Sequence, residues 1–133
     1  MNEIPRTPSP DRPRSIVFIA YPEMGLLDLT GAQTVFWAAS KAMTKRGLPG
    51  YERHTASLDG GLIQTAEGLA VETLRLSDFA ERSIDTLIVP GAPNIRQAMN
   101  DSLELVAWLQ AASANARRTA SVSGTRRAKR SGS

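Results

Sequence analysis

Two short, continuous apolar segments limit the choice of fold more than any other feature of this sequence. They are "SIVFIAY", which starts at Ser15, and "DTLIVPG", which starts at Asp85. Both are rich in β-branched residues, neither alternates with polar residues, and each runs into turn-forming residues. Such segments are typical of strands buried on both faces, which occur in parallel sheets covered by helices.

Helical patterns separate these segments from further strands. Residues 26–46 are predicted to form a helix that stops at "GLPG". The residues assigned to its apolar spacing are Val35, Phe36, Ala39 and Met43. A second helix is predicted over residues 95–115, with a break at Asn100–Asp101. Its apolar face consists of Leu105, Trp108, Leu109 and Ala112.

The remaining segments are shorter. Residues 51–58 are predicted to form a second parallel strand, and "RTASV", residues 118–122, a last one. Residues 62–65 and 69–73 predict a small hairpin around a turn at Glu67–Gly68. In "RLSDFAERS" we expect a short helical turn capped by Ser77. The strands at 15–20, 51–57 and 85–89 are expected to be parallel, in an α/β sheet with helices on both faces.

Length and charge indicate one domain with two unstructured ends. The 133 residues suffice for a single core. Residues 1–14 hold four of the eight prolines and are predicted to be a disordered arm, followed by the domain at 15–125 and a basic tail at 126–133. Residues 1–104 carry ten basic and thirteen acidic side chains, whereas residues 105–133 carry six basic and none acidic. The basicity therefore belongs to the tail, which favours a solvated end over a nucleic-acid-binding face.

Composition excludes several kinds of site. The chain has no cysteine, which removes disulfides, thiolate metal ligands and cysteine nucleophiles. With His54 as the single histidine, a zinc site of the His/Cys kind is not expected, and no metal or cofactor is predicted. No apolar run reaches the ~20 residues of a membrane span, and the N-terminus has no secretory apolar region. A cytoplasmic location is the default expectation.

Three blocks occur along the chain in the order "IVFIAYPEMGLLDLTGAQTVFWAA", "DTLIVPGAPN" and "RRTASVSGT". Together they resemble the ThiJ/PfpI superfamily, a flavodoxin-like group related to class I glutamine amidotransferase domains. The similarity covers residues 15–122 and is closest to two branches. One is the N-terminal sensor domain of AraC-type transcriptional regulators, and the other is isonitrile hydratase. The resemblance implies a flavodoxin-like parallel sheet sandwiched by helices.

The resemblance also implies a site at one edge of that sheet. In open parallel sheets, sites form beyond the carboxyl ends of the strands. We therefore expect Asp28, the amides of Gly91 and Ala92, and the turn at Ser123–Gly124 to meet there. In the superfamily this edge carries a nucleophilic cysteine on a strand-to-helix turn, an acidic residue beside it, and amides that hold negative charge. The acidic position of isonitrile hydratases matches Asp28.

The sequence departs from the superfamily pattern where the cysteine belongs. Val122 is followed directly by Ser123, Gly124 and Thr125, and "RRAKRSGS" stands where an apolar helix is expected. The sequence therefore predicts a domain that is incomplete after residues 118–122, the strand that precedes the expected cysteine turn. Ser123 would need a base within hydrogen-bond reach, and His54 lies in a predicted strand far from this edge, so a working serine triad is not favoured.

Each candidate residue also has a purely structural interpretation. Asp28 is equally suited to a helix N-cap or first turn, and Gly91 and Gly124 to tight turns. Aromatic side chains at helix spacing, including Phe36 and Trp108, are more often core than ligand contacts, and the adjacent Trp37 is expected at an interface.

The favoured function is a non-catalytic module, linked to transcription regulation, that senses a small molecule. An isonitrile hydratase-like lyase is the alternative. A third interpretation, a nucleic-acid-binding protein, is supported only by the basic residues of the tail. The expected partners are a small-molecule ligand and further copies of the chain, with no sequence-specific DNA contact and no membrane.

Overall fold

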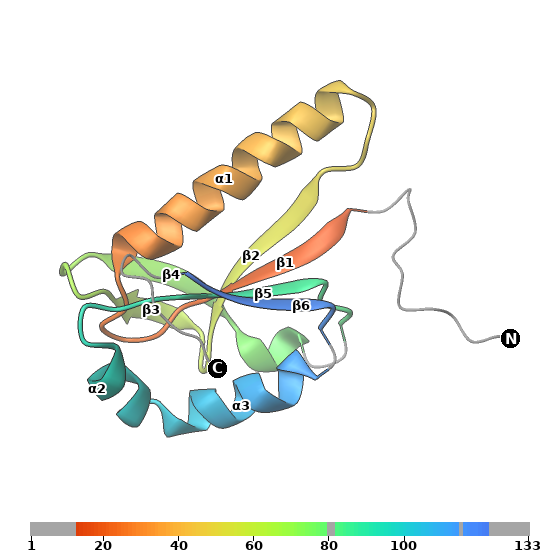
Figure 1. The fold of residues 1–133 in the computed structure, drawn as a ribbon. Helices are drawn as coiled ribbons and strands as arrows, with labels where there is room; N and C mark the ends of the chain where they lie inside the picture. Colours follow the sequence, from red (N-terminus) through yellow and green to blue (C-terminus); the bar gives the residue numbers. More distant parts are fainter. Residues whose placement is uncertain (1–12, 80–81, 115, 123–133) are drawn as a thin grey trace, which may run out of the picture.

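A mixed β-sheet flanked by helices forms the body of the protein. The structure, a computed structural model, describes residues 13–79, 82–114 and 116–122. Within these residues, six strands form a sheet in the order β3-β4-β2-β1-β5-β6. Helix α1 (Leu26–Lys45) lies against one face, and α2 (Ile95–Asn100) and α3 (Leu103–Ser113) lie against the other, as Figure 1 shows. The predicted α/β class and layer order are confirmed.

The parallel part of the sheet is built around the first predicted strand. Strand β1 (Arg14–Ile19) pairs in parallel with β2 (Tyr51–Ser57) on one side and β5 (Thr86–Pro90) on the other. Strand β6 (Arg118–Val122) extends the sheet in parallel beyond β5. The four residues Ile16, Val17, Phe18 and Ile19 are fully buried. A strand enclosed on both faces explains why its sequence does not alternate.

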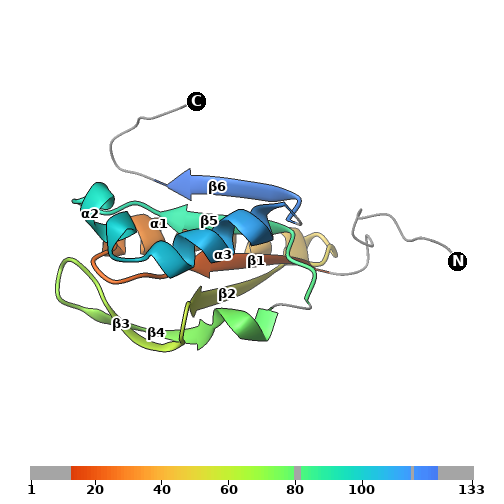
Figure 2. The ribbon, with the colours of Figure 1, turned by 90° about the horizontal axis from the view of Figure 1, so that it is seen from below.

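The predicted hairpin forms the opposite edge of the sheet. Strands β3 (Gly61–Gln64) and β4 (Ala70–Arg75) are antiparallel to each other, and β4 then joins β2 in parallel, with Ala56 opposite Leu74. Figure 2 shows this hairpin and β6 at opposite sides of the sheet.

Helix α1 packs through most of the predicted face, and Val35 is the exception. Leu29 is buried, and the Phe36 ring meets Phe18 and Tyr51 edge-on, at centroid distances of 5.9 and 5.2 Å. Val35 is 64% exposed, so its place in the predicted apolar face was wrong. Successive helical residues point about 100° apart, and Phe36 takes the inward direction.

The second helical segment is broken where the sequence indicated. Helix α2 ends at Asn100 and α3 begins at Leu103. Leu105 is buried, and the rest of the predicted face packs on the core as half-buried side chains, namely Trp108, Leu109 and Ala112. The helical turn after β4 is a 3₁₀ turn that spans Leu76–Phe79. It begins before Ser77, so the prediction that Ser77 caps it was wrong.

A charged pair fastens the amino ends of three strands. Asp85 is buried, and its carboxylate accepts hydrogen bonds from Arg117 Nε (2.5 Å) and Arg117 Nη2 (3.3 Å), and from Thr86 Oγ1 (2.7 Å). Its backbone N–H donates to Ser15 O and its carbonyl accepts from Arg118 N, each at 2.9 Å. Burial acts to raise the pKa of Asp85, but the hydrogen bonds and positive charges outweigh it, so this pKa lies below its usual value.

Candidate functional site

The loops that follow β1 and β5 meet at the carboxyl edge of the sheet. Gly25 N donates to Gly91 O at 2.8 Å. The Tyr21 hydroxyl donates to Pro90 O at 2.5 Å, inside the core. Strands β1 and β5 are neighbours in the sheet, so these two hydrogen bonds connect the segments at their carboxyl ends. The predicted meeting of these two loops is confirmed.

Asp28 stands at this junction, in the first turn of α1. A Cβ atom added at Gly25 would lie 3.5 Å from Asp28 Oδ2 and 3.3 Å from Gly91 O. Because Gly25 has no side chain, the Asp28 carboxylate and the Gly91 carbonyl can both lie close to its backbone. Asp28 is half-buried.

The Tyr21 hydroxyl shares this environment. Burial, and then the negative charge of Asp28, raise the pKa of Tyr21 well above its ordinary value. The phenol therefore stays protonated at every physiological pH and keeps its hydrogen bond to Pro90 O. The charge of Asp28 is therefore near enough to the phenol to oppose its ionisation.

The tip of the β3–β4 hairpin completes one wall of the junction. Glu67 Oε1 accepts a hydrogen bond from Leu26 N at 3.0 Å, which places a carboxylate at the amino end of α1. Ala66 N donates to Met24 O at 2.9 Å. Sequence reasoning missed this contact, because Glu67 and Leu26 are 41 residues apart and no local signal joins them.

A strained turn leads from β1 into the junction. Met24 N donates to Tyr21 O at 3.2 Å, which closes a four-residue turn. Its third residue, Glu23, has φ 69°, a conformation that favours glycine or asparagine. Glu23 N donates to Gln64 O at 3.0 Å, so the hairpin supports this conformation. The Glu23 side chain is exposed.

The predicted site residues fall into two groups. Asp28 and Gly91 lie together, and Ala92 follows Gly91 directly as a half-buried residue. Ser123 and Gly124 lie outside the described residues, so their predicted place at this edge stays a prediction.

His54 is far from Asp28 in the layered structure. Thr55 of β2 bonds Gln33 of α1, so the preceding residue, His54, projects to the opposite face of the sheet. There its ring packs against Phe79 at a centroid distance of 5.3 Å. Nε2 lies 3.6 Å from Glu52 Oε2, beyond hydrogen-bond distance. His54 and Asp28 thus lie on different faces of the sheet, and this arrangement does not suit a catalytic triad.

Two further searches concern the described residues only. Among them, no group of three or more His, Asp or Glu side chains is arranged to hold a metal ion. No helix in the same ranges has the length and apolar character needed to cross a membrane.

Comparison with known proteins places this geometry in a fold. No protein-family model and no curated protein matches the sequence. Among solved structures, a ThiJ/PfpI family protein from Pseudomonas syringae matches with a TM-score of 0.66 and 21% identity over 82% of this chain. An AraC family transcriptional regulator from Pseudomonas putida matches with a TM-score of 0.58 and 22% identity over 76% of the chain. DJ-1beta from Drosophila melanogaster matches with a TM-score of 0.56 and 17% identity over 82% of the chain.

These matches establish the fold. The chain has the flavodoxin-like α/β fold of ThiJ/PfpI and DJ-1 proteins. It spans 41% of the P. syringae protein, 61% of the P. putida regulator and 54% of DJ-1beta.

Proposed function

We propose that this chain belongs to the ThiJ/PfpI superfamily and acts as a small-molecule-sensing domain of the kind found in AraC-type regulators. The fold and the "LDLTG" and "VPG" blocks support the superfamily. The likeness to the P. putida AraC family regulator supports the regulatory branch. We further propose that the ligand is bound and not converted, since the sequence provides no thiolate nucleophile.

The position of Asp28 carries this proposal. Its carboxylate lies against Gly25, beside the Gly91 carbonyl, where the loops after two adjacent strands are joined. A carboxylate accepts hydrogen bonds and donates none, so it selects a ligand with an N–H or O–H group.

We assign the other half of recognition to backbone amides. The ligand's carbonyl or carboxylate oxygen would accept from the amides of Gly91 and Ala92 and from the turn at Gly124. No role is assigned to Ser123. A compound with a donor and a carbonyl acceptor side by side, such as a secondary amide, satisfies both halves. Transmission to DNA would then depend on a separate DNA-binding element and on association between like domains.

A melting experiment with an amide probe tests the proposal. Saturating N-butylformamide should raise the melting temperature, because a ligand at 100 times its Kd stabilises the folded state by about 2.7 kcal/mol. Asp28→Asn should remove the effect. Asp59→Asn, an exposed carboxylate in the β2–β3 turn, should leave it unchanged. An unchanged melting temperature in the wild type, or an equal rise in Asp28→Asn, would contradict the assigned site.

The alternative is an isonitrile hydratase-like lyase that uses the same Asp28. Such an enzyme adds water across the isonitrile carbon, so that R–NC and H₂O give R–NH–CHO. Incubation with n-butyl isonitrile and measurement of N-butylformamide separates the two functions. Formamide production by the wild type that stops in Asp28→Asn would replace the sensing proposal with the lyase.

A further inference from the structure

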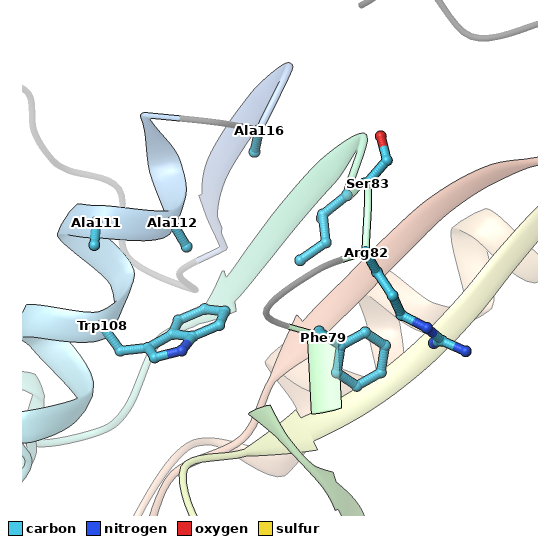
Figure 3. Close-up of a pocket in the computed structure, with 8 residues that line it drawn as sticks. Phe79, Arg82, Ser83, Trp108, Ala111, Ala112 and Ala116 are labelled. Carbon is cyan, nitrogen blue, oxygen red and sulfur yellow. The ribbon is translucent and has the colours of Figure 1, made fainter. Parts of the chain in front are cut away.

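A pocket lies at the edge of the sheet opposite to Asp28. It has a volume of about 290 Å³ and is formed between the C-terminal half of α3 and the segments that precede β5 and β6 (Figure 3). Its lining residues are Phe79, Arg82, Ser83, Ile84, Trp108, Ala111, Ala112 and Ala116. Ile84 and Ala116 stand before the first residues of β5 and β6, whereas Gly91 follows β5, so this α3 pocket is separate from the proposed sensing site.

The side chains of the α3 pocket are aromatic on two sides and small on the third. Figure 3 shows Trp108 projecting from α3 toward the side on which Phe79 stands, with Ala112 and Ala116 beside the space between them. The alanines leave this space open, because a methyl group is the only side chain they bring to it. Arg82, which also lines the pocket, lies over the Phe79 ring at 4.9 Å from its centroid.

We infer that the α3 pocket binds a small, flat, apolar ring compound of one or two fused rings, at a site distinct from that of Asp28. Aromatic rings pack favourably against other rings in offset or edge-on arrangements, and the half-buried Trp108 ring offers such a contact. Phe79 is 2% exposed and lines the pocket from the side of the core. Size agrees with this class, since an apolar cavity of ~150 Å³ already holds benzene. Trp108 provides the ring contact, the buried Phe79 ring closes the pocket toward the core, and the small side chains of Ala112 and Ala116 leave its width open.

Indole is a suitable probe, and the two tryptophans provide an internal comparison. Trp108 lines the α3 pocket, whereas Trp37 is an exposed residue of α1 on the other face of the sheet. In ¹H–¹⁵N spectra of the labelled protein, each indole N–H gives one peak, assigned with Trp37→Phe and Trp108→Phe. Titration with unlabelled indole should move the Trp108 peak saturably and leave the Trp37 peak in place.

Filling the space should remove the binding. Ala112→Leu should weaken indole binding at least tenfold, and Ala107→Leu, on the exposed side of the same helix, should leave it unchanged. If Ala112→Leu does not give a folded spectrum, Ala111→Leu at the exposed rim provides the same test. A Trp108 peak that does not move up to the solubility limit of indole, or full binding by the filled variant, would overturn the inference.

Discussion

Replacing Tyr21 with phenylalanine tests how the two loops at the junction are held together. Tyr21 is 1% exposed, and its hydroxyl donates to Pro90 O at 2.5 Å. Tyr21→Phe keeps the ring but leaves a buried carbonyl without this donor, which costs about 1–3 kcal/mol. A loss of ~2 kcal/mol corresponds to a fall in melting temperature of roughly 7–9 °C for a domain of this size.

The same substitution has a pH dependence of known sign. Because the pKa of folded Tyr21 is raised above the ordinary tyrosine value of 10.0, the protonated phenol contributes stability that is complete below pH 10 and declines as pH rises above it. At pH 11 the unfolded chain has gained about 1.4 kcal/mol from ionising this group, and the folded chain has not. The stability difference between wild type and Tyr21→Phe should therefore shrink by about that amount between pH 8 and pH 11.

Urea denaturation at both pH values measures these differences. Tyr51→Phe is the matched control, since its ring contact with Phe36 would be retained, and a change of about 0.5 kcal/mol or less is expected. Equal losses in the two variants at pH 8, or a Tyr21→Phe difference that grows toward pH 11, would refute the assigned role of the Tyr21 hydroxyl.

Three further predictions concern parts of the fold away from this hydroxyl. Asp85→Asn should lower the free energy of unfolding at pH 7 by roughly 2 kcal/mol. It should also flatten the pH dependence of stability below pH 4, because a carboxyl with a lowered pKa loses its stabilising contribution as pH falls. Melting temperatures measured from pH 7 into acid test both effects. Gly50→Ala places a Cβ atom 2.0 Å from Ser40 Oγ, which accepts a hydrogen bond from Tyr51 N, so this substitution should lower the free energy of unfolding by about 1–2 kcal/mol. In a chain that already carries Ser40→Ala, Gly50→Ala should be nearly free of this cost, and a double-mutant cycle measures the difference. The chain should self-associate, since β6 pairs with β5 alone among the described strands and its residues Arg118 to Ser121 are exposed, and a concentration-independent monomer by sedimentation would contradict this.

Much of the fold follows from local sequence signals. The apolar runs at Ser15 and Asp85 predict β1 and β5 because burial on both faces excludes polar alternation. The break between α2 and α3 follows from Asn100–Asp101, and the hairpin from its Glu67–Gly68 turn. The adjacency of Asp28 and Gly91 follows in turn from the rule that parallel strands end at one edge.

The parts that were missed depend on contacts between distant residues. Glu67 at the amino end of α1 and Arg117 on Asp85 are joined only by the tertiary structure, so no spacing rule predicts either. The assignment of Val35 to the predicted apolar face failed because two adjacent apolar residues compete for one inward direction, and only packing against Phe18 and Tyr51 decides for Phe36.

An NMR titration with N-butylformamide tests the sensing site most directly. Backbone ¹H–¹⁵N peaks of Gly25, Asp28 and Gly91 should move saturably as the probe is added, because the ligand is proposed to lie between the Asp28 carboxylate and the loop after β5. In Asp28→Asn these shifts should be lost, while peaks around Trp108 stay unchanged in both proteins. Saturable shifts confined to residues away from the junction, or the same shifts in Asp28→Asn, would contradict the account.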